Sequence, residues 1–203
     1  MSYKTIIFDL GKVIFDYSWD HMYDYFSKLA NISLAEVKAR FAVNSDPIFL
    51  DFERGLITTQ DYMKHVEQLL GIRMTIPQFA DGLNSIYEDS YEGIEEILGE
   101  LELKYLLVAL SNTNPVHADE WRRRYADQII YFSYIFCSHE MRSRKPEPVI
   151  YEQVIRSVGT MPEQCVFFDD RQDNVDAAKS VGIPSFTVRS PAEIREVIAK
   201  LGL

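Results

Sequence analysis

The segment TIIFDLGKVIFD, residues 5–16, decides the fold of this chain. Its first four residues form a short run of β-branched and aromatic side chains, which is typical of a buried strand. The run ends on Asp9, so a carboxylate stands directly at the carboxyl end of the predicted strand. Gly11 and a second carboxylate, Asp16, follow in the same segment.

Strand patterns return in the second half of the chain, and helical patterns separate them. The expected strands lie at residues 105–110, within 130–137, at 165–168 and at 184–188. The expected helices lie near residues 93–101 and at 115–125, 147–158, 174–181 and 191–201. Strands that alternate with helices predict right-handed crossovers and a parallel sheet, hence an α/β fold with a Rossmann-like core.

Polar side chains follow three of these strands at the point where each strand ends. Asp9 follows the first strand, Ser111 and Asn112 follow the run at 105–110, and the pair Asp169–Asp170 follows the run at 165–168. Ligands of parallel sheets bind beyond the carboxyl ends of the strands. We therefore expect these residues to meet at one edge of the sheet, although they lie far apart in the sequence.

The stretch between the first strand and the others is helical in pattern. Apolar residues at helical spacing predict helices at residues 20–30, 34–42, 47–53, 59–70 and 77–88. No convincing strand pattern interrupts them. The sequence therefore predicts a helical insertion directly after the first strand.

Composition excludes some classes of function. The 203 residues carry a formal net charge of −10, which opposes binding to nucleic acid. The sequence contains no run of 18 apolar residues, so no membrane span is predicted, and the N-terminus does not resemble a secretory signal. Cys137 and Cys165 both lie in apolar runs and are expected to be core thiols. We expect a cytoplasmic protein without a nucleic-acid or membrane partner, and the acidic charge does not exclude a small phosphorylated metabolite as substrate.

The strand-end residues suit phosphoryl transfer, which needs an in-line nucleophile and positive charge on the phosphate. Asp9 can be the nucleophile and form an aspartyl-phosphate. Because a carboxylate repels a phosphate dianion, a hard cation with oxygen ligands is needed, and Mg²⁺ suits Asp9 together with Asp169 or Asp170. Lys145, in the segment RSRKPEPVIY, can neutralise both the aspartate and the transferred group.

Each of these residues also has an ordinary structural interpretation. A strand-end aspartate is commonly a turn residue, and Ser111–Asn112 can cap a helix. Lys145 can be a solvated surface charge, while Asp173 and Asn174 are good candidates to cap the helix that follows them. The order of the four signals, each at a predicted strand or loop end, favours the catalytic interpretation.

In this order the signals resemble the four motifs of the haloacid dehalogenase superfamily. The motifs are Phe8-Asp9-Leu10-Gly11, Leu110-Ser111-Asn112, Lys145-Pro146-Glu147-Pro148 and Phe168-Asp169-Asp170. The long gap after the first motif matches the place where the family inserts a helical cap of the C1 type. The resemblance implies a Rossmann-like core at residues 1–16 and 93–203 and a cap at 17–92.

The resemblance also implies roles for single residues. Asp9 and Lys145 match the catalytic nucleophile and its lysine clamp. Ser111 matches the phosphate-binding hydroxyl, with Asn112 beside it, and Lys145 also contacts the phosphate.

A Mg²⁺ cofactor is implied in the same way. Its expected ligands are Asp9, the backbone carbonyl of Gly11, and Asp170, with Asp169 as a co-ligand or as support behind the ligands. The expected activity is that of a phosphoric monoester hydrolase, with sugar phosphates favoured as substrates.

Gly11 departs from the usual family pattern. Most phosphatases of the superfamily carry at this position an aspartate that protonates the leaving oxygen. Losing such a group lowers the rate about 10²–10⁴-fold. The chain resembles the branch of bacterial α-D-glucose-1-phosphate phosphatases and, more distantly, the phosphatase domain of soluble epoxide hydrolases. Asp16 can replace the acid, or it can cap the first helix of the insertion.

Two other functions stay open at this point. The first is a 2-haloacid dehalogenase, which needs neither this acid nor Mg²⁺, but the acidic pair Asp169–Asp170 argues against it. The second is a phosphate-binding or regulatory protein with low turnover. Arg142 and Arg144 can line an anionic substrate or can pair with Glu140 and Glu147.

Overall fold

Five parallel strands form the central sheet of the protein, whose computed structural model describes residues 2–41 and 45–203. The strand order is β5-β4-β1-β6-β7. The strands are β1 (Thr5–Phe8), β4 (Leu106–Ser111), β5 (Tyr134–Cys137), β6 (Cys165–Asp169) and β7 (Ser185–Thr187). All five strands and the predicted α/β fold are confirmed, with β1 between β4 and β6 at the centre.

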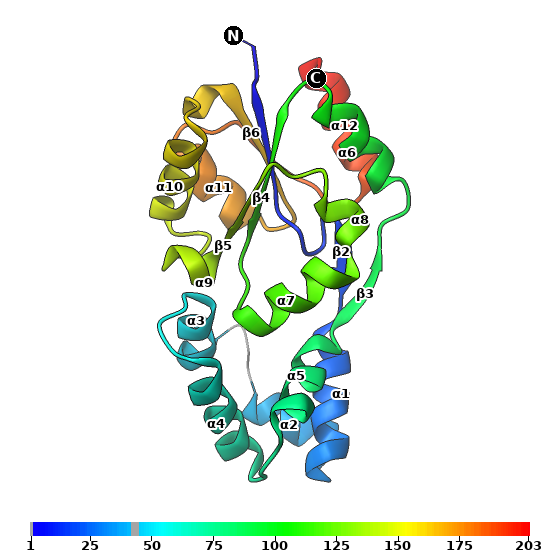
Figure 1. Cartoon of the computed structure of the whole chain (residues 1–203), viewed down its shortest axis with the longest axis vertical. Coiled ribbons are helices and arrows are strands. Elements are labelled where there is room, and N and C mark those ends of the chain that lie inside the picture. The colour runs from blue at the N-terminus through cyan, green and yellow to red at the C-terminus, as the bar shows by residue number, and fades with distance from the viewer. Residues whose placement is uncertain (1, 42–44) are drawn as a thin grey trace.

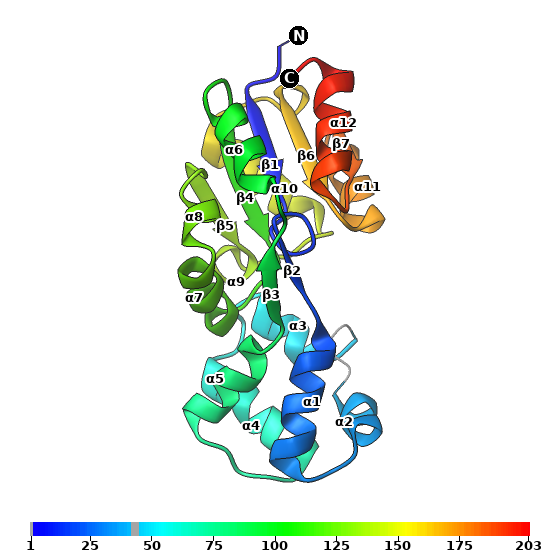
Figure 2. The same cartoon turned by 90° about the vertical axis from the view of Figure 1, so that its right-hand side faces the viewer.

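Helices cover both faces of this sheet (Figures 1 and 2). The helices α6 (Ile94–Glu102) and α12 (Pro191–Leu201) lie on one face, and α10 (Pro148–Val158) and α11 (Gln172–Ser180) lie on the other. Successive residues of β1 point to opposite faces, so Ile6 and Phe8 belong to one apolar cluster and Ile7 to the other. Burial on both faces explains why β1 reads as a continuous apolar run.

A separate group of helices lies beyond the carboxyl ends of the strands (Figure 1). These helices are α1 (Trp19–Ala30), α2 (Leu34–Arg40), α3 (Pro47–Glu53), α4 (Thr59–Leu70) and α5 (Ile76–Asn84). We call them the helical layer. The predicted end of the second helix at residue 42 lies outside the described residues.

Two short strands join the helical layer to the sheet, and the second lies in the stretch where no strand was predicted, so that prediction was wrong. They are β2 (Phe15–Tyr17) and β3 (Tyr87–Ser90), and they pair antiparallel. The helix predicted at residues 77–88 accordingly ends at Asn84. The strands escaped prediction because they are short, and because their pairing joins segments that are distant in the sequence.

The remaining helices lie in the connections between the strands of the sheet. They are α7 (Pro115–Arg124), α8 (Ala126–Ile129), α9 (Ser138–Met141) and a short 3₁₀ helix (Pro162–Gln164). Among the described residues, no helix is both long enough and apolar enough to cross a membrane.

Candidate active site

Three carboxylates meet where β1 and β6 end. Asp9 follows β1, Asp169 closes β6 and Asp170 comes next, and one oxygen of each lies within 4.8 Å of the others. The parallel register that pairs Phe8 with Phe168 brings the two strand ends together. Carboxylates this close repel one another unless a cation lies among them. The cluster therefore fits a hard cation with oxygen ligands.

Lys145 supplies positive charge to this cluster. Its side chain is only 1% exposed, and its Nζ lies 2.8 Å from Asp9 Oδ1 and 2.7 Å from Asp169 Oδ2. Asn112 fixes the lysine backbone, since its Nδ2 donates to the Lys145 carbonyl and its Oδ1 accepts from the Lys145 N–H, both at 2.8 Å. The amide nitrogen of Asn112 carries a second N–H, which the contact with Lys145 does not use. The predicted contact of Asn112 with phosphate therefore stays a prediction.

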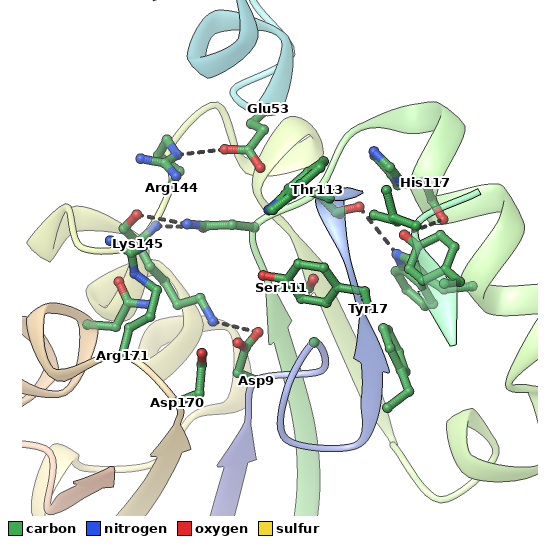
Figure 3. Close-up of a pocket in the computed structure, with 18 of the residues that line it drawn as sticks. Asp9, Tyr17, Glu53, Ser111, Thr113, His117, Arg144, Lys145, Asp170 and Arg171 are labelled. Carbon is green, nitrogen blue, oxygen red and sulfur yellow. Dashed lines mark hydrogen bonds and ion pairs between the residues drawn. The ribbon is translucent and has the colours of Figure 1, made fainter. Parts of the chain in front are cut away.

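Asp169 and Asp170 have different surroundings. Asp169 is fully buried and accepts from the backbone N–H of Arg171 at 2.9 Å and from Asn174 Nδ2 at 2.9 Å, besides its contact with Lys145. Asp170 is partly exposed and lines the pocket above the sheet (Figure 3). Asp169 thus orients the lysine, while Asp170 is better placed to bind a ligand in the pocket.

Burial and charge shift the pKa values of these groups. Burial raises the pKa of Asp9 to about 7; Lys145 opposes this shift, while Asp169 and Asp170 add to it. Burial alone would lower the pKa of Lys145, but the carboxylates of Asp169 and Asp9 outweigh it and raise that pKa. Burial and Asp169 also raise the pKa of Asp170. Asp9 and Asp169 share the single ammonium group of Lys145, so the cluster has an excess of carboxylates that a metal ion would offset.

The loop after Asp9 brings Gly11 to the pocket. Ser111, at the end of β4, lines the same pocket. Tyr17 packs directly on Gly11, since a Cβ added to the glycine would lie 2.7 Å from Tyr17 Cε1. The metal contact predicted for the Gly11 carbonyl and the phosphate contact predicted for Ser111 stay predictions.

Asp16 lies outside the residues that line this pocket. Its carboxylate contacts Lys12 Nζ and accepts from the backbone N–H of Tyr17 at 2.7 Å. Its predicted capping role was wrong, because Ser18 caps α1 and accepts from the Asp20 N–H. Asp16 instead fixes the turn that leads into β2.

The capping predicted for Asp173 and Asn174 was also wrong. Helix α11 begins at Gln172, so both residues lie inside it. Asp173 pairs with Arg171 at 2.7 Å, and Asn174 donates to Asp169. The amide of Asn174 is therefore used to hold the carboxylate cluster.

The helical layer provides the opposite wall of the pocket. Its contribution is mainly aromatic, with one buried acid, and consists of Trp19, Phe49, Leu50 and Glu53. Glu53 pairs with Arg144 at 3.0 Å, and Arg54 pairs with Glu147 at 2.6 Å. Arg144 does pair with an acid, but its ion-pair partner is Glu53 and not Glu140 or Glu147. Arg142 donates to the Gly55 carbonyl at 2.7 Å.

Several pocket residues were missed by sequence analysis. They are Tyr17, Trp19, Phe49, Glu53, His117 and Arg171. An aromatic residue at helical spacing looks the same whether it packs into a core or lines a pocket. Only Arg171 carried a signal, since it directly follows the acidic pair Asp169–Asp170.

The chain is similar to known hydrolases over most of its length. The family model for haloacid dehalogenase-like hydrolases matches residues 3–182. A D-ribitol-5-phosphate phosphatase of Bacteroides thetaiotaomicron is 27% identical over 200 residues, covering 95% of each chain. A phosphorylated carbohydrates phosphatase of Thermotoga maritima is 33% identical over 91 residues, covering 45% of this chain and 42% of that protein.

Solved structures agree with this similarity. A haloacid dehalogenase family enzyme of Bacteroides thetaiotaomicron superposes with a TM-score of 0.87 at 26% identity, covering 98% of this chain and 99% of that one. A crystal structure of that enzyme in complex with magnesium and inorganic phosphate gives a TM-score of 0.82 at 28% identity, covering 94% and 96%.

Proposed function

Because the chain belongs to the haloacid dehalogenase-like hydrolases, we propose that it is a magnesium-dependent phosphatase that acts through Asp9. The observation that carries the proposal is the carboxylate cluster of Asp9, Asp169 and Asp170, with buried Lys145 between Asp9 and Asp169. Relatives that cover most of the chain are named phosphatases, which supports the same class of reaction.

The residues that would hold Mg²⁺ are Asp9, Asp170 and the carbonyl of Gly11, with Asp169 behind them. When bound, the ion would offset the repulsion between the Asp9 carboxylate and the phosphate oxygens. The chemistry of the donors fits, because carboxylate and carbonyl oxygens are the ligands that Mg²⁺ prefers. Burial is the main cause of the raised pKa of Asp9, and a bound cation would lower that pKa.

The reaction would have two steps, transfer of the phosphoryl group to Asp9 and hydrolysis of the aspartyl-phosphate, and the chain's own residues would support both. A carboxylate oxygen of Asp9 bonds to phosphorus while the ester P–O bond breaks, the electron pair of that bond goes to the leaving oxygen, and the alcohol forms when this oxygen takes a proton from water. Lys145 and the Leu10 N–H, both at 2.8 Å from Asp9 Oδ1, fix the orientation of the carboxylate. Lys145 and Ser111 would hold the phosphoryl oxygens. Water then hydrolyses the aspartyl-phosphate and releases phosphate.

We also propose that residues 17–92 act as a cap over a core formed by residues 1–16 and 93–203. The cap would select the substrate, because Trp19, Phe49 and Glu53 line the pocket opposite Asp9. An aromatic wall with a buried carboxylate suits the faces and hydroxyls of a sugar or polyol. A small sugar phosphate is therefore the favoured substrate, as the names of two relatives suggest.

The test is a screen of phosphorylated metabolites with Mg²⁺ and with EDTA. We expect phosphate release that requires Mg²⁺ and is lost in Asp9→Asn. The matched control is Asp24→Asn, which makes the same change at an exposed ion pair with Lys28 and should keep full activity. Turnover that survives EDTA or the Asp9 change would refute the mechanism. Chloride release from 2-chloropropionate would favour a dehalogenase, and phosphate binding without any turnover would favour a regulatory protein.

A further inference from the structure

Gly11 and Tyr17 form a matched pair beside the nucleophile. A Cβ at position 11 would lie 2.7 Å from Tyr17 Cε1 and 3.1 Å from Tyr17 Cδ1. Real Cβ atoms do not approach ring carbons so closely, so a side chain at position 11 requires the ring to move. The tyrosine ring therefore occupies the space that a larger residue at position 11 would need.

The ring of Tyr17 is held from several directions. It packs edge-on against Trp19 with the ring centroids 5.7 Å apart, and Lys12 Nζ lies 5.1 Å from its centroid. Its backbone is fixed by the β2–β3 pairing with Tyr87 and by the hydrogen bond to Asp16. A side chain fixed in this way presents its hydroxyl at a defined point.

That hydroxyl points into the pocket, on the side of Asp9 that faces the helix carrying Glu53 (Figure 3). Within residues 2–41 and 45–203, it has no hydrogen-bond partner. Burial raises the pKa of Tyr17 above its usual range, and the carboxylates of Asp9 and Asp170 add to this shift. The phenol thus keeps its proton at neutral pH and is available as a donor.

In-line transfer places the leaving oxygen opposite the nucleophile. Asp9 lies at the carboxyl end of the central strand β1. The leaving group must therefore extend toward the helical layer, where the Tyr17 hydroxyl points. We propose that Tyr17 donates a hydrogen bond to the leaving oxygen of the substrate. This inference rests on the proposed function and adds a catalytic residue to it.

The phenol keeps its own proton in this step. As the P–O bond breaks, its electron pair goes to the leaving oxygen, the Tyr17 hydrogen bond stabilises the charge that develops there, and water supplies the proton. Asp16 is less suited to this role, because its carboxylate is already engaged by Lys12 and the Tyr17 N–H.

The test compares Tyr17→Phe with the wild type on two Mg²⁺-supported substrates. One is p-nitrophenyl phosphate, whose leaving group needs little stabilisation, and the other is ribitol 5-phosphate, an alkyl ester with a poor leaving group. Tyr17→Phe keeps the ring against Gly11 and should lower kcat on the alkyl ester about 10²-fold. It should change kcat on the aryl ester far less. The control is Tyr62→Phe, which removes a buried hydroxyl outside the pocket. It should leave kcat unchanged on both esters.

The possible outcomes separate this inference from the proposed function. A wild type that cleaves both esters, with Tyr17→Phe losing equal factors on both or nothing on either, overturns the role of Tyr17 alone. A wild type that cleaves neither ester, nor any other phosphate ester in the screen, overturns the proposed function and the role of Tyr17 together.

Discussion

At the scale of single residues, buried charges in this protein occur as groups that balance one another. Lys145 is almost fully buried, which would be unfavourable for a lone ammonium group, but Asp9 and Asp169 both contact it. The group keeps one more carboxylate than ammonium even before Asp170 is counted. Removal of Lys145 alone would leave buried carboxylates without a partner, so Lys145→Met should impair folding as well as turnover.

His117 is the contrasting case of a buried group without a charge partner. Neither of its ring nitrogens has a hydrogen-bond partner within the described part of the chain, and burial lowers its pKa to about 3. The unfolded chain takes up a proton near the ordinary pKa of about 6.5, whereas the folded protein does not. Stability is therefore lost as the pH falls from about 6.5 toward 3.

This gives a prediction for the pH dependence of folding. Between pH 7.5 and 5.5, the wild type should lose about 1.4 kcal/mol more unfolding free energy than His117→Gln. Urea denaturation at the two pH values measures this difference, and the same change at exposed His21 is the control. An equal pH dependence in the wild type and His117→Gln would show that this histidine is not buried in its neutral form.

At the scale of elements, one glycine fixes the contact between the helical layer and helix α9, which follows β5. Gly55 follows α3 with a φ of +64°, and a Cβ there would lie 2.1 Å from the carbonyl oxygen of His139. Gly71, after α4, has a similar φ of +71° but open space around it. The two glycines therefore separate backbone strain from steric overlap.

We predict unequal effects of alanine at these two positions. Gly71→Ala should cost about 1 kcal/mol, from the left-handed backbone alone. Gly55→Ala should cost about 1–3 kcal/mol more, and it should raise KM, because α3 carries Phe49 and Glu53 into the pocket. Denaturation curves and steady-state kinetics measure both effects. Equal losses of stability would show that the close approach of Gly55 to α9 is not maintained in solution.

The success of sequence analysis differed between elements. The strands of the sheet and most helices could be predicted, because their signals are local: apolar runs for β1 and β6, and apolar residues at helical spacing for α4. Strands β2 and β3 could not, because their pairing joins distant segments. The same holds for the site, where Asp9 and Asp170 follow strand ends, whereas Tyr17 gains its role only by packing on Gly11.

At the scale of the whole molecule, the pocket lies between two parts of the chain joined by β2 and β3 (Figure 2). The protein has a net charge of −10, but Arg144, Lys145 and Arg171 line this pocket. These cations share the pocket with the carboxylates of Asp9, Glu53 and Asp170, so binding of a small anion is expected to depend on a bound metal ion. A ligand that contacts both parts is expected to stabilise them together.

Metal binding should raise the thermal stability, because an ion that binds only the folded protein stabilises it. A Mg²⁺ concentration of about 100 times Kd should add about 2.7 kcal/mol, which for a chain of this size is roughly 5–10 °C in Tm. Differential scanning fluorimetry with Mg²⁺ and with EDTA measures this shift. Asp170→Asn should lose it, whereas Asp173→Asn, which changes a surface pair with Arg171, should keep it. A full shift in Asp170→Asn would exclude this carboxylate as a ligand.

The most direct measurement of the central claim is the site of phosphorylation during turnover. The enzyme is mixed with Mg²⁺ and substrate, quenched with acid within milliseconds, digested and analysed by mass spectrometry. We predict a phosphate group on the peptide that contains Asp9, and none in Asp9→Asn. A phosphate group on another residue, or no phosphopeptide while phosphate release proceeds in a burst, would contradict the account.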